Sequence, residues 1–299
     1  MKQLFNVLAV FKNECRALPE WIDHYLNEGA NRIVLVNNNS TDGWEDSCAD
    51  YMNNKRVTFL EDNRKWSQVE IYDDVFFKIK QETHFLLVCD LDEFVYPQHT
   101  FTTIEEYLAF LKRINFEGCI KIPWKAFGSS GHKKHPKGGI IKNFIYRRKY
   151  KNSSHTLVKY ICRNKDTLRL GCHVPVLDNG SFYDSRLRKS DNSPTLTVDE
   201  ESLKCDILAM NHYQIQSEEF FRECKMTRGD ALDQKSENIR DMSYFDKHDF
   251  RDIKDKRLKK LHRLRKPKGH TPRELNAIIR IINHFKKISD FRKNSNFYN

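Results

Sequence analysis

The chain has 299 residues, of which 39% are apolar or aromatic, enough for one large α/β domain or a domain with a helical appendage. Charged residues make up 31%, and no window of about twenty consecutive apolar residues occurs, which excludes an integral membrane protein. The net charge of +11 favours an anionic partner, such as a phosphorylated small molecule, an acidic membrane surface or nucleic acid.

Residues 4–11 form an apolar run that predicts a buried strand, and residues 17–28 carry apolar side chains at a helical spacing. Pro19 suits the first turn of that helix, and Gly29 suits its end. Further elements are predicted as strands at 32–36, 56–60 and 84–89 and as a helix at 67–82. The sequence therefore predicts an α/β fold with a mostly parallel central sheet and helices on its faces.

Polar clusters directly follow three of these strands. Asn13 follows the first strand, the run 37–43 follows the second, and the run 90–93 follows the fourth. Ligands of such sheets bind beyond the carboxyl ends of the strands, so we expect these clusters to converge on one rim. Thr41 or Asp42 is expected to cap the helix after the second strand.

The pattern changes after Pro97. The predicted elements there are a helix at 103–113, strands at 118–127, 140–146 and 205–210, a hairpin of 157–162 and 166–177, and a helix at 217–229. Ser217 is expected to cap that last helix, and the stretches 128–139 and 178–195 are predicted to be loops.

The eight cysteines form no C-x-x-C pair. The apolar stretch at the N-terminus is too short for a membrane span, and nothing in the sequence indicates a secretory signal. We therefore expect a cytoplasmic protein with reduced cysteines, and a zinc site remains the weaker alternative.

The sharpest chemical feature is Asp90-Leu91-Asp92-Glu93, which comes directly after an apolar strand. Burying carboxylates is costly unless a positive group neutralises them. For a D-x-D arrangement this group is often a divalent ion, and hard oxygen ligands suit Mg²⁺ or Mn²⁺. Such an ion would bridge a diphosphate and stabilise charge on its leaving group. The alternative is a solvated acidic turn or a helix N-terminus.

Several motifs resemble those of known enzymes. The run 36–43 resembles the D-D-x-S-T-D-G loop of family 2 glycosyltransferases, and 11–14 resembles the Y-N-E ending of their first strand. The stronger resemblance is to glycosyltransferase family 92, whose motifs occur here in the same order over roughly residues 5–230. The matching residues are Asn13-Glu14, Glu20-Trp21 with Tyr25, Asn38-Asn39-Ser40-Thr41-Asp42, Gln68, Asp90-Leu91-Asp92-Glu93-Phe94, His212-Tyr213, Ser217-Glu218-Glu219-Phe220 and Arg228-Gly229.

This resemblance implies a nucleotide-binding fold of the glycosyltransferase A type and sugar transfer with inversion at the anomeric carbon. The residues that it implies for donor binding are Ala9, Phe11, Asn13, Asn37, Asn38, Asp42, Arg64, Gln68 and Asp90. Asn37 and Asn38 stand where family 2 has aspartate, and an amide can bind uracil or guanine. A UDP-sugar is favoured as donor, and a GDP-sugar is the alternative.

The resemblance also implies that Asp90 and Asp92 face the ribose and hold Mn²⁺ or Mg²⁺, with Asp92 the stronger metal ligand. His212 would complete the metal site, with His173 as its rival; the alternative for His212 is a structural role. Inverting transfer needs a general base for the acceptor hydroxyl. The sequence does not identify this base, and the candidates are Glu93, Asp178 and Asp184. The aromatic residues that are candidates for stacking on sugar rings are Trp66, Trp124 and Tyr183.

We expect a catalytic domain at 1–250, with a nucleotide-sugar-binding half (1–97) and an acceptor-side half (98–250), followed by a basic helical appendage at 251–299. In the appendage Lys and Arg outnumber Asp and Glu by roughly four to one. Its basic face is either solvated or contacts an anionic membrane, where a lipid-linked saccharide acceptor would lie. Nucleic-acid binding is disfavoured because no matching motif accompanies the charge.

Two other functions compete with sugar transfer. A nucleotidyltransferase would also use a parallel sheet and metal-bound carboxylates, but the sequence lacks a glycine-rich phosphate loop after the first strand. A non-catalytic protein that binds anionic surfaces or nucleic acid through its basic C-terminus would leave Asp90 and Asp92 unexplained.

Overall fold

The computed structural model describes residues 2–227 and 240–264. The compact unit that carries the cavity ends at Leu258. The expected boundary at residue 250 falls inside this unit, because β15 (Ile253–Lys254) pairs with β7 (Tyr146–Arg147). The appendage from residue 265 onward lies outside the described residues. Among the residues described, no helix is long and apolar enough to cross a membrane.

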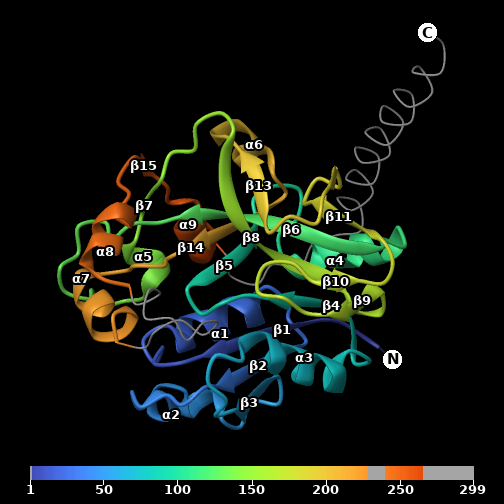
Figure 1. Ribbon diagram of the computed structural model, residues 1–299, viewed down its shortest axis with the longest axis horizontal. Helices are drawn as coiled ribbons and strands as arrows, with labels where there is room; N and C mark the ends of the chain where they lie inside the picture. The colour runs from blue at the N-terminus through green and yellow to red at the C-terminus, as the bar shows by residue number, and fades with distance from the viewer. Residues whose placement is uncertain (1, 228–239, 265–299) are drawn as a thin grey trace. The chain divides into compact units, whose positions relative to one another are not determined.

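Four parallel strands form the first half of the main sheet, in the order β3-β2-β1-β4 (Figure 1). Their bounds are β1 (Gln3–Phe11), β2 (Arg32–Asn37), β3 (Val57–Glu61) and β4 (Thr83–Val88). The helices that connect them are α1 (Leu18–Asn27), α2 (Trp44–Ser47) and α3 (Gln68–Ile79), with the 3-10 turn η1 (Ala49–Tyr51) after α2. The predicted alternation of strands and helices is confirmed here.

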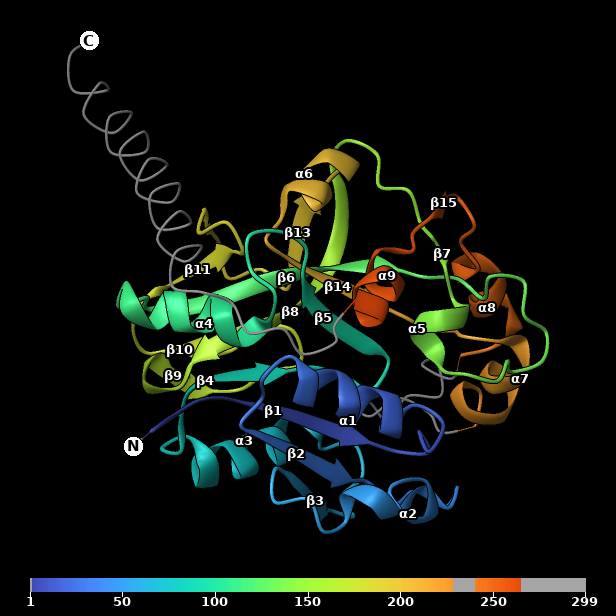
Figure 2. The same cartoon turned by 180° about the vertical axis from the view of Figure 1, so that it is seen from behind.

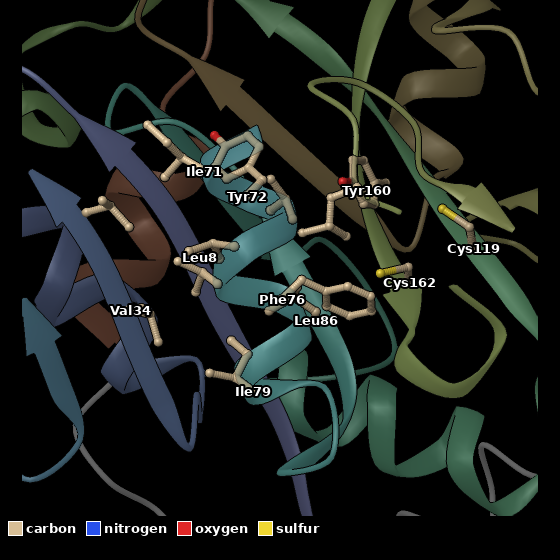
Figure 3. Packing of buried hydrophobic residues seen from close by; sticks show 14 residues of the cluster. Leu8, Val34, Ile71, Tyr72, Phe76, Ile79, Leu86, Cys119, Tyr160 and Cys162 are labelled. Carbon is tan, nitrogen blue, oxygen red and sulfur yellow. The ribbon is translucent and has the colours of Figure 1, made fainter. Parts of the chain in front are cut away.

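Helix α3 packs on one face of these strands (Figure 3). Side chains alternate between the two faces of a strand, so every second residue of β1, β2 and β4 meets the helix. The fully or nearly fully buried contacts of this layer include Ile71, Tyr72, Phe76 and Ile79 of the helix and Leu8, Val34 and Leu86 of the strands. This apolar layer fixes the carboxyl ends of the strands that carry the polar clusters.

Helix α1 and helix α4 (Ile104–Arg113) cover the other face of the same strands (Figure 2). Thr103 begins α4, and its side chain accepts a hydrogen bond from the amide of Glu106 at 3.2 Å. Glu28, at the end of α1, accepts from the amide of Ile104 at 2.9 Å. The two helices therefore satisfy each other's terminal backbone groups.

The second half of the sheet is mixed. Strand β8 (Ser154–Arg163) lies antiparallel between β4 and β6 (Gly118–Ala126), as Figure 1 shows. The predicted hairpin of 157–162 and 166–177 is wrong, because β9 (Thr167–Arg169) pairs with β10 (Val176–Leu177) after the turn η2 (Asn164–Asp166). The outer strands are β11 (Ser181–Asp184), β12 (Lys189–Ser190) and β13 (Thr195–Val198).

Strand β5 (Glu93–Pro97) begins within the carboxylate motif and was not predicted from the sequence. It pairs with β14 (Leu208–His212), which also runs parallel to β6. The strand predicted at 205–210 therefore begins later, because α6 (Glu200–Cys205), capped by Asp199, occupies the residues before it. This arrangement brings His212 next to the carboxylates.

Short elements replace three longer predictions. Residues 140–146 form α5 (Ile140–Asn143) followed by β7 rather than one strand, and a carboxylate of Glu20 accepts from the amide of Ile140. Ser217 caps α7 (Glu218–Phe220) as predicted, but a π-helix, η3 (Phe221–Lys225), follows it. The helix after the second strand has Gly43 at its N-cap and no side-chain cap, so Thr41 and Asp42 do not cap it. The remaining helices are α8 (Met242–His248) and α9 (Arg257–Leu264).

All eight cysteines are free thiols. Four of them are buried, so they act as small apolar side chains, as expected.

Candidate active site

A cavity of about 660 Å³ opens at the carboxyl edge of the sheet. On the side of the parallel half, residues at and after the ends of β1, β2 and β4 line the cavity. The lining on that side includes Phe11, Lys12, Asn38, Asn39, Trp66 and Gln68. On the other side of β4, strands β6, β8 and β14 supply Trp124, Lys159 and His212. The predicted convergence of the polar clusters on one rim is thus confirmed for the first, second and fourth strands.

The turn that carries the carboxylates is shaped by α1. The indole Nε1 of Trp21 donates to the carbonyl oxygens of Asp90 at 2.9 Å and Glu93 at 3.1 Å. The hydroxyl of Tyr25 donates to the Glu93 carbonyl and accepts from the amide of Val95, both at 3.0 Å. Both side chains are fully buried. The Trp and Tyr of the E-W-x-x-x-Y pattern therefore hold the backbone of the D-x-D-E turn.

A second set of hydrogen bonds ties the ends of β1 and β2 together. The amide of Asn13 donates to Ser40 Oγ at 2.9 Å, and Asn13 Oδ1 accepts from the amide of Thr41 at 2.8 Å. Asp42 Oδ2 accepts from the amide of Cys15 at 2.8 Å. Asn13 has a φ of 53°, a left-handed conformation that asparagine tolerates better than most residues. Asn13 and Asp42 thus brace the loop.

Asp90 presents its carboxylate to the cavity, where 35% of the side chain is exposed. One oxygen accepts from Gln68 Nε2 and from the Tyr72 hydroxyl, each at 3.3 Å. The other lies 2.9 Å from the Nζ of Lys159, whose side chain is 1% exposed. Burial raises the pKa of Asp90, but the Lys159 ammonium outweighs it and the pKa is lowered.

Asp92 is buried beneath the cavity with two partners. Its Oδ2 lies 2.7 Å from the Nζ of Lys225, which is also 3.2 Å from Glu14. Its Oδ1 lies 3.5 Å from His212 Nε2. Burial raises the pKa of Asp92, but the charge of Lys225 and the His212 ring lower it well below its usual value. Asp92 is therefore an ionised carboxylate.

Glu93 lies directly beneath this pair and is fully buried. Its Oε2 accepts from the amide of Asp90 at 2.7 Å and lies 3.8 Å from the Nζ of Lys159. Burial raises the pKa of Glu93 well above its usual value, despite the charge of Lys159. Lys159 thus faces two carboxylates with one charge, and it lies closer to Asp90, at 2.9 Å, than to Glu93, at 3.8 Å. Glu93 supports the turn rather than facing the cavity.

The predicted metal ligands do not form a ready-made cage. Within the described ranges, no group of three or more His, Cys, Asp or Glu side chains is arranged to hold a metal ion. Asp90 is turned toward Lys159, whereas Asp92 Oδ1 and His212 Nε2 face each other across 3.5 Å, a separation that adjacent ligands of one ion can have. Among the described residues, the other nitrogen of His212, Nδ1, is buried without a hydrogen-bond partner. Asp92 and His212 are thus the two predicted metal ligands that the structure brings side by side.

The predicted donor-binding residues divide into two groups. Four of them line the cavity: Phe11, Asn38, Gln68 and Asp90. Five are not among the lining residues: Ala9, Asn13, Asn37, Asp42 and Arg64. Ala9 is buried within β1, Asn37 Nδ2 donates to Glu61 at 2.8 Å, and Arg64 forms ion pairs with Asp62 and Asp74, both at 2.7 Å.

Two of the three candidate bases lie away from the cavity. Asp178 is exposed at the turn before β11, and its amide donates to the Asp166 carbonyl at 2.8 Å. Asp184 is buried, and its carboxylate accepts from the amides of Arg186 and Arg188 at 2.9 and 3.0 Å. Neither residue lines the cavity.

Two lysines of the site were missed by the sequence reasoning. Lys159 interrupts the apolar strand β8, which is a signal of a buried cation that needs a carboxylate partner. Lys225 follows Phe221 by one helical turn and lies on the buried side of η3. Its sequence context offered no comparable signal, because the partners lie 211 and 133 residues away.

The chain has an α/β fold with a largely parallel sheet and a cavity at its carboxyl edge, the edge at which such sheets bind their ligands. More specifically, the chain belongs to glycosyltransferase family 92, whose model matches residues 10–266. A glycosyltransferase family 92 protein of Oryza sativa subsp. japonica is 21% identical over 221 residues, which are 73% of this chain and 34% of the relative. The chain thus spans about a third of the length of that relative.

Two solved structures resemble part of the chain. Staphylococcus aureus TarS 1–349 in complex with UDP is 15% identical, with a TM-score of 0.35, and the match covers 55% of this chain and 47% of TarS 1–349. HddC from Yersinia pseudotuberculosis is 12% identical, with a TM-score of 0.33, and the match covers 54% of this chain and 78% of HddC.

Proposed function

We propose that this protein transfers a sugar from a nucleoside diphosphate sugar to a saccharide or lipid-linked saccharide acceptor, with inversion, on a fold of the glycosyltransferase A type. The observation that carries the proposal is the pair Asp90 and Asp92 at one edge of a cavity of about 660 Å³. Membership of family 92 supports the same reaction class.

The donor nucleoside would bind on the side of β1, β2 and β3. Asn38 uses its Nδ2 to donate to the carbonyls of Asp62 and Arg64, at 2.6 and 2.8 Å. Its Oδ1 is then the atom left to accept from a base, and the N3–H of uracil is a suitable donor. The N1–H of guanine is another suitable donor. UDP remains the favoured nucleotide, and GDP is the alternative.

Asp92 and His212 would hold the divalent ion, Mn²⁺ or Mg²⁺. Such ions are commonly bound by one or two carboxylates together with substrate phosphates, so a pair of protein ligands is sufficient. When bound, the ion neutralises the charge that develops on the departing diphosphate. Lys225 holds Asp92 Oδ2 and so leaves Oδ1 for the ion.

Nucleotide binding tests this function. In thermal unfolding, UDP with Mn²⁺ is expected to stabilise the wild type by about 2.7 kcal/mol at a free concentration 100 times Kd, which corresponds to about 5 °C. Asp92→Asn is expected to lose this shift. Asp178→Asn, an exposed carboxylate outside the cavity lining, is the matched control and should keep it.

Stabilisation by GDP instead of UDP would change the donor base but keep the reaction class. If neither nucleotide stabilises the wild type with Mn²⁺ or Mg²⁺, the proposed function is wrong.

A further inference from the structure

The orientation of His173 in the cavity wall is set by one hydrogen bond. His173 follows β9, and its Nδ1 lies 3.0 Å from the carbonyl oxygen of Val158 in β8. A carbonyl oxygen only accepts hydrogen bonds, so Nδ1 carries the proton. In the neutral ring Nε2 therefore keeps its lone pair, and His173 lines the cavity.

The neighbours of His173 place it on the side of the site away from the nucleoside. Strand β8 is next to β4 on the side opposite β1, so His173 lies beyond Asp90 from the Asn38 loop. The ring of Trp124 contacts His173 edge-on at 5.5 Å between centroids and also contacts His212 at 4.0 Å. An aromatic surface beside a polar nitrogen suits a sugar ring with a hydroxyl to be bound.

The charged groups that face His173 are Lys159, Asp90 and His212. Burial and the charge of Lys159 lower the pKa of His173 below its usual value, although Asp90 opposes this effect. With Nδ1 held on the Val158 carbonyl, Nε2 is the nitrogen of the neutral ring that can take a proton.

The carboxylates of the site are poorly suited to act as the base. Asp92 is ion-paired with Lys225 at 2.7 Å, and Asp90 with Lys159 at 2.9 Å, and both have a lowered pKa. Glu14 contacts Lys225 at 3.2 Å. A base works best with a pKa near the operating pH, and the lowered pKa values of Asp90 and Asp92 move away from it.

We propose that His173 is the general base of the transfer, which rests on the proposed function. The acceptor hydroxyl oxygen attacks the anomeric carbon of the donor sugar. The bond from that carbon to the diphosphate oxygen breaks, and the nucleoside diphosphate leaves with the electron pair. The hydroxyl proton passes to Nε2 of His173, and the resulting imidazolium is stabilised by the nearby carboxylate of Asp90. Solvent then removes this proton.

The variant His173→Asn tests this role. Its side-chain amide can still donate to the Val158 carbonyl, so the local hydrogen bond is kept while the basic nitrogen is lost. Release of UDP from UDP-hexoses would be measured with water and with methyl hexosides as acceptors, using the donor that reacts fastest. We expect the rate to fall by about 10² to 10⁴-fold, with UDP and Mn²⁺ affinities unchanged.

The pH profile separates a base from a structural residue. The wild-type rate should rise with pH through the pKa of His173, which is lowered from its usual value, and then level off; the low rate of His173→Asn should lack this acid limb. Added imidazole should restore part of the rate of His173→Ala. His155→Asn, an exposed histidine outside the cavity lining, is the control and should match the wild type.

Three outcomes would overturn the base role. One is a rate of His173→Asn within threefold of the wild type. Another is loss of Mn²⁺ affinity in that variant, measured by electron paramagnetic resonance, because it would make His173 a metal ligand. The third is absence of nucleotide binding and of UDP release in the wild type, which would overturn the proposed function itself.

Discussion

Lys225 shows at the scale of a single residue how the site is held together. Its ammonium is buried between Asp92 and Glu14, at 2.7 and 3.2 Å. Removing one partner of a buried ion pair leaves uncompensated charge, which typically costs about 3 to 5 kcal/mol. The lysine is therefore expected to stabilise the metal-free protein.

Lys225→Met should lower the free energy of unfolding by about 3 to 5 kcal/mol in the presence of EDTA. Mn²⁺ should restore part of this loss, because the ion can take over the neutralisation of Asp92, and its stabilising effect should exceed that on the wild type. Urea unfolding with and without Mn²⁺ measures both effects. Lys189→Met, at an exposed position of β12, is the control. Equal Mn²⁺ effects in variant and wild type would contradict an ion bound at Asp92.

The sequence predicted the acidic half of this charge cluster but not its basic half. Asp90 and Asp92 stood out because they lie two positions apart directly after an apolar strand. Their partners, Lys159 in β8 and Lys225 in η3, are distant in the sequence and meet the carboxylates only in the folded chain. Buried carboxylates need a positive neighbour, and this expectation is confirmed. The neighbours in the described residues are lysines, whereas the sequence predicted a divalent ion.

At the scale of elements, local periodicity predicted the parallel half of the sheet well. Strands β1 to β4 and helices α1 and α3 are buried on one or both faces, so their apolar spacing is strong. The position of β8 between β4 and β6 depends on pairing between distant segments, which periodicity does not report. Strand β5 was missed because its five residues form part of the carboxylate motif.

The close contact between the start of β6 and β11 can be tested by substitution. Gly118 has a φ of 103°, and a Cβ there would lie 2.1 Å from the backbone oxygen of Ser181 in β11. Gly118→Ala should therefore cost at least about 3 kcal/mol, from left-handed strain together with a backbone clash. Gly43→Ala is the matched control: φ is 68°, but no atom of the described residues beyond its chain neighbours lies within 4 Å of the added Cβ, so only about 1 kcal/mol is expected. Urea unfolding of both variants measures the difference, and similar losses would contradict the clash.

At the scale of the whole molecule, we expect the compact unit to bind the nucleotide sugar and the basic C-terminus to contact an anionic membrane. Residues 265–299 carry nine Lys or Arg and only two Asp or Glu. Each basic residue near an anionic membrane contributes about 1 kcal/mol of attraction, so this segment alone would suffice for reversible attachment.

Truncation after residue 264 should abolish binding to vesicles that contain phosphatidylserine, and should leave the UDP and Mn²⁺ affinities of the compact unit unchanged. Vesicle sedimentation at low and high salt measures the first effect, and calorimetry measures the second. Neutral phosphatidylcholine vesicles are the control for both proteins. Equal vesicle binding by the full chain and the truncated chain would assign the attraction to another surface.

The long sequence separations within the site have a consequence for biosynthesis. Lys225 comes 211 residues after Glu14 and 133 residues after Asp92. On the ribosome, the strands that carry the acidic residues are therefore made well before the lysine that neutralises them. A nascent chain that stops short of Lys225 contains the whole parallel half of the sheet, yet it lacks the cation that pairs with Glu14 and Asp92. The ion pairs of this rim are thus completed late in synthesis, and the first 97 residues alone cannot form them.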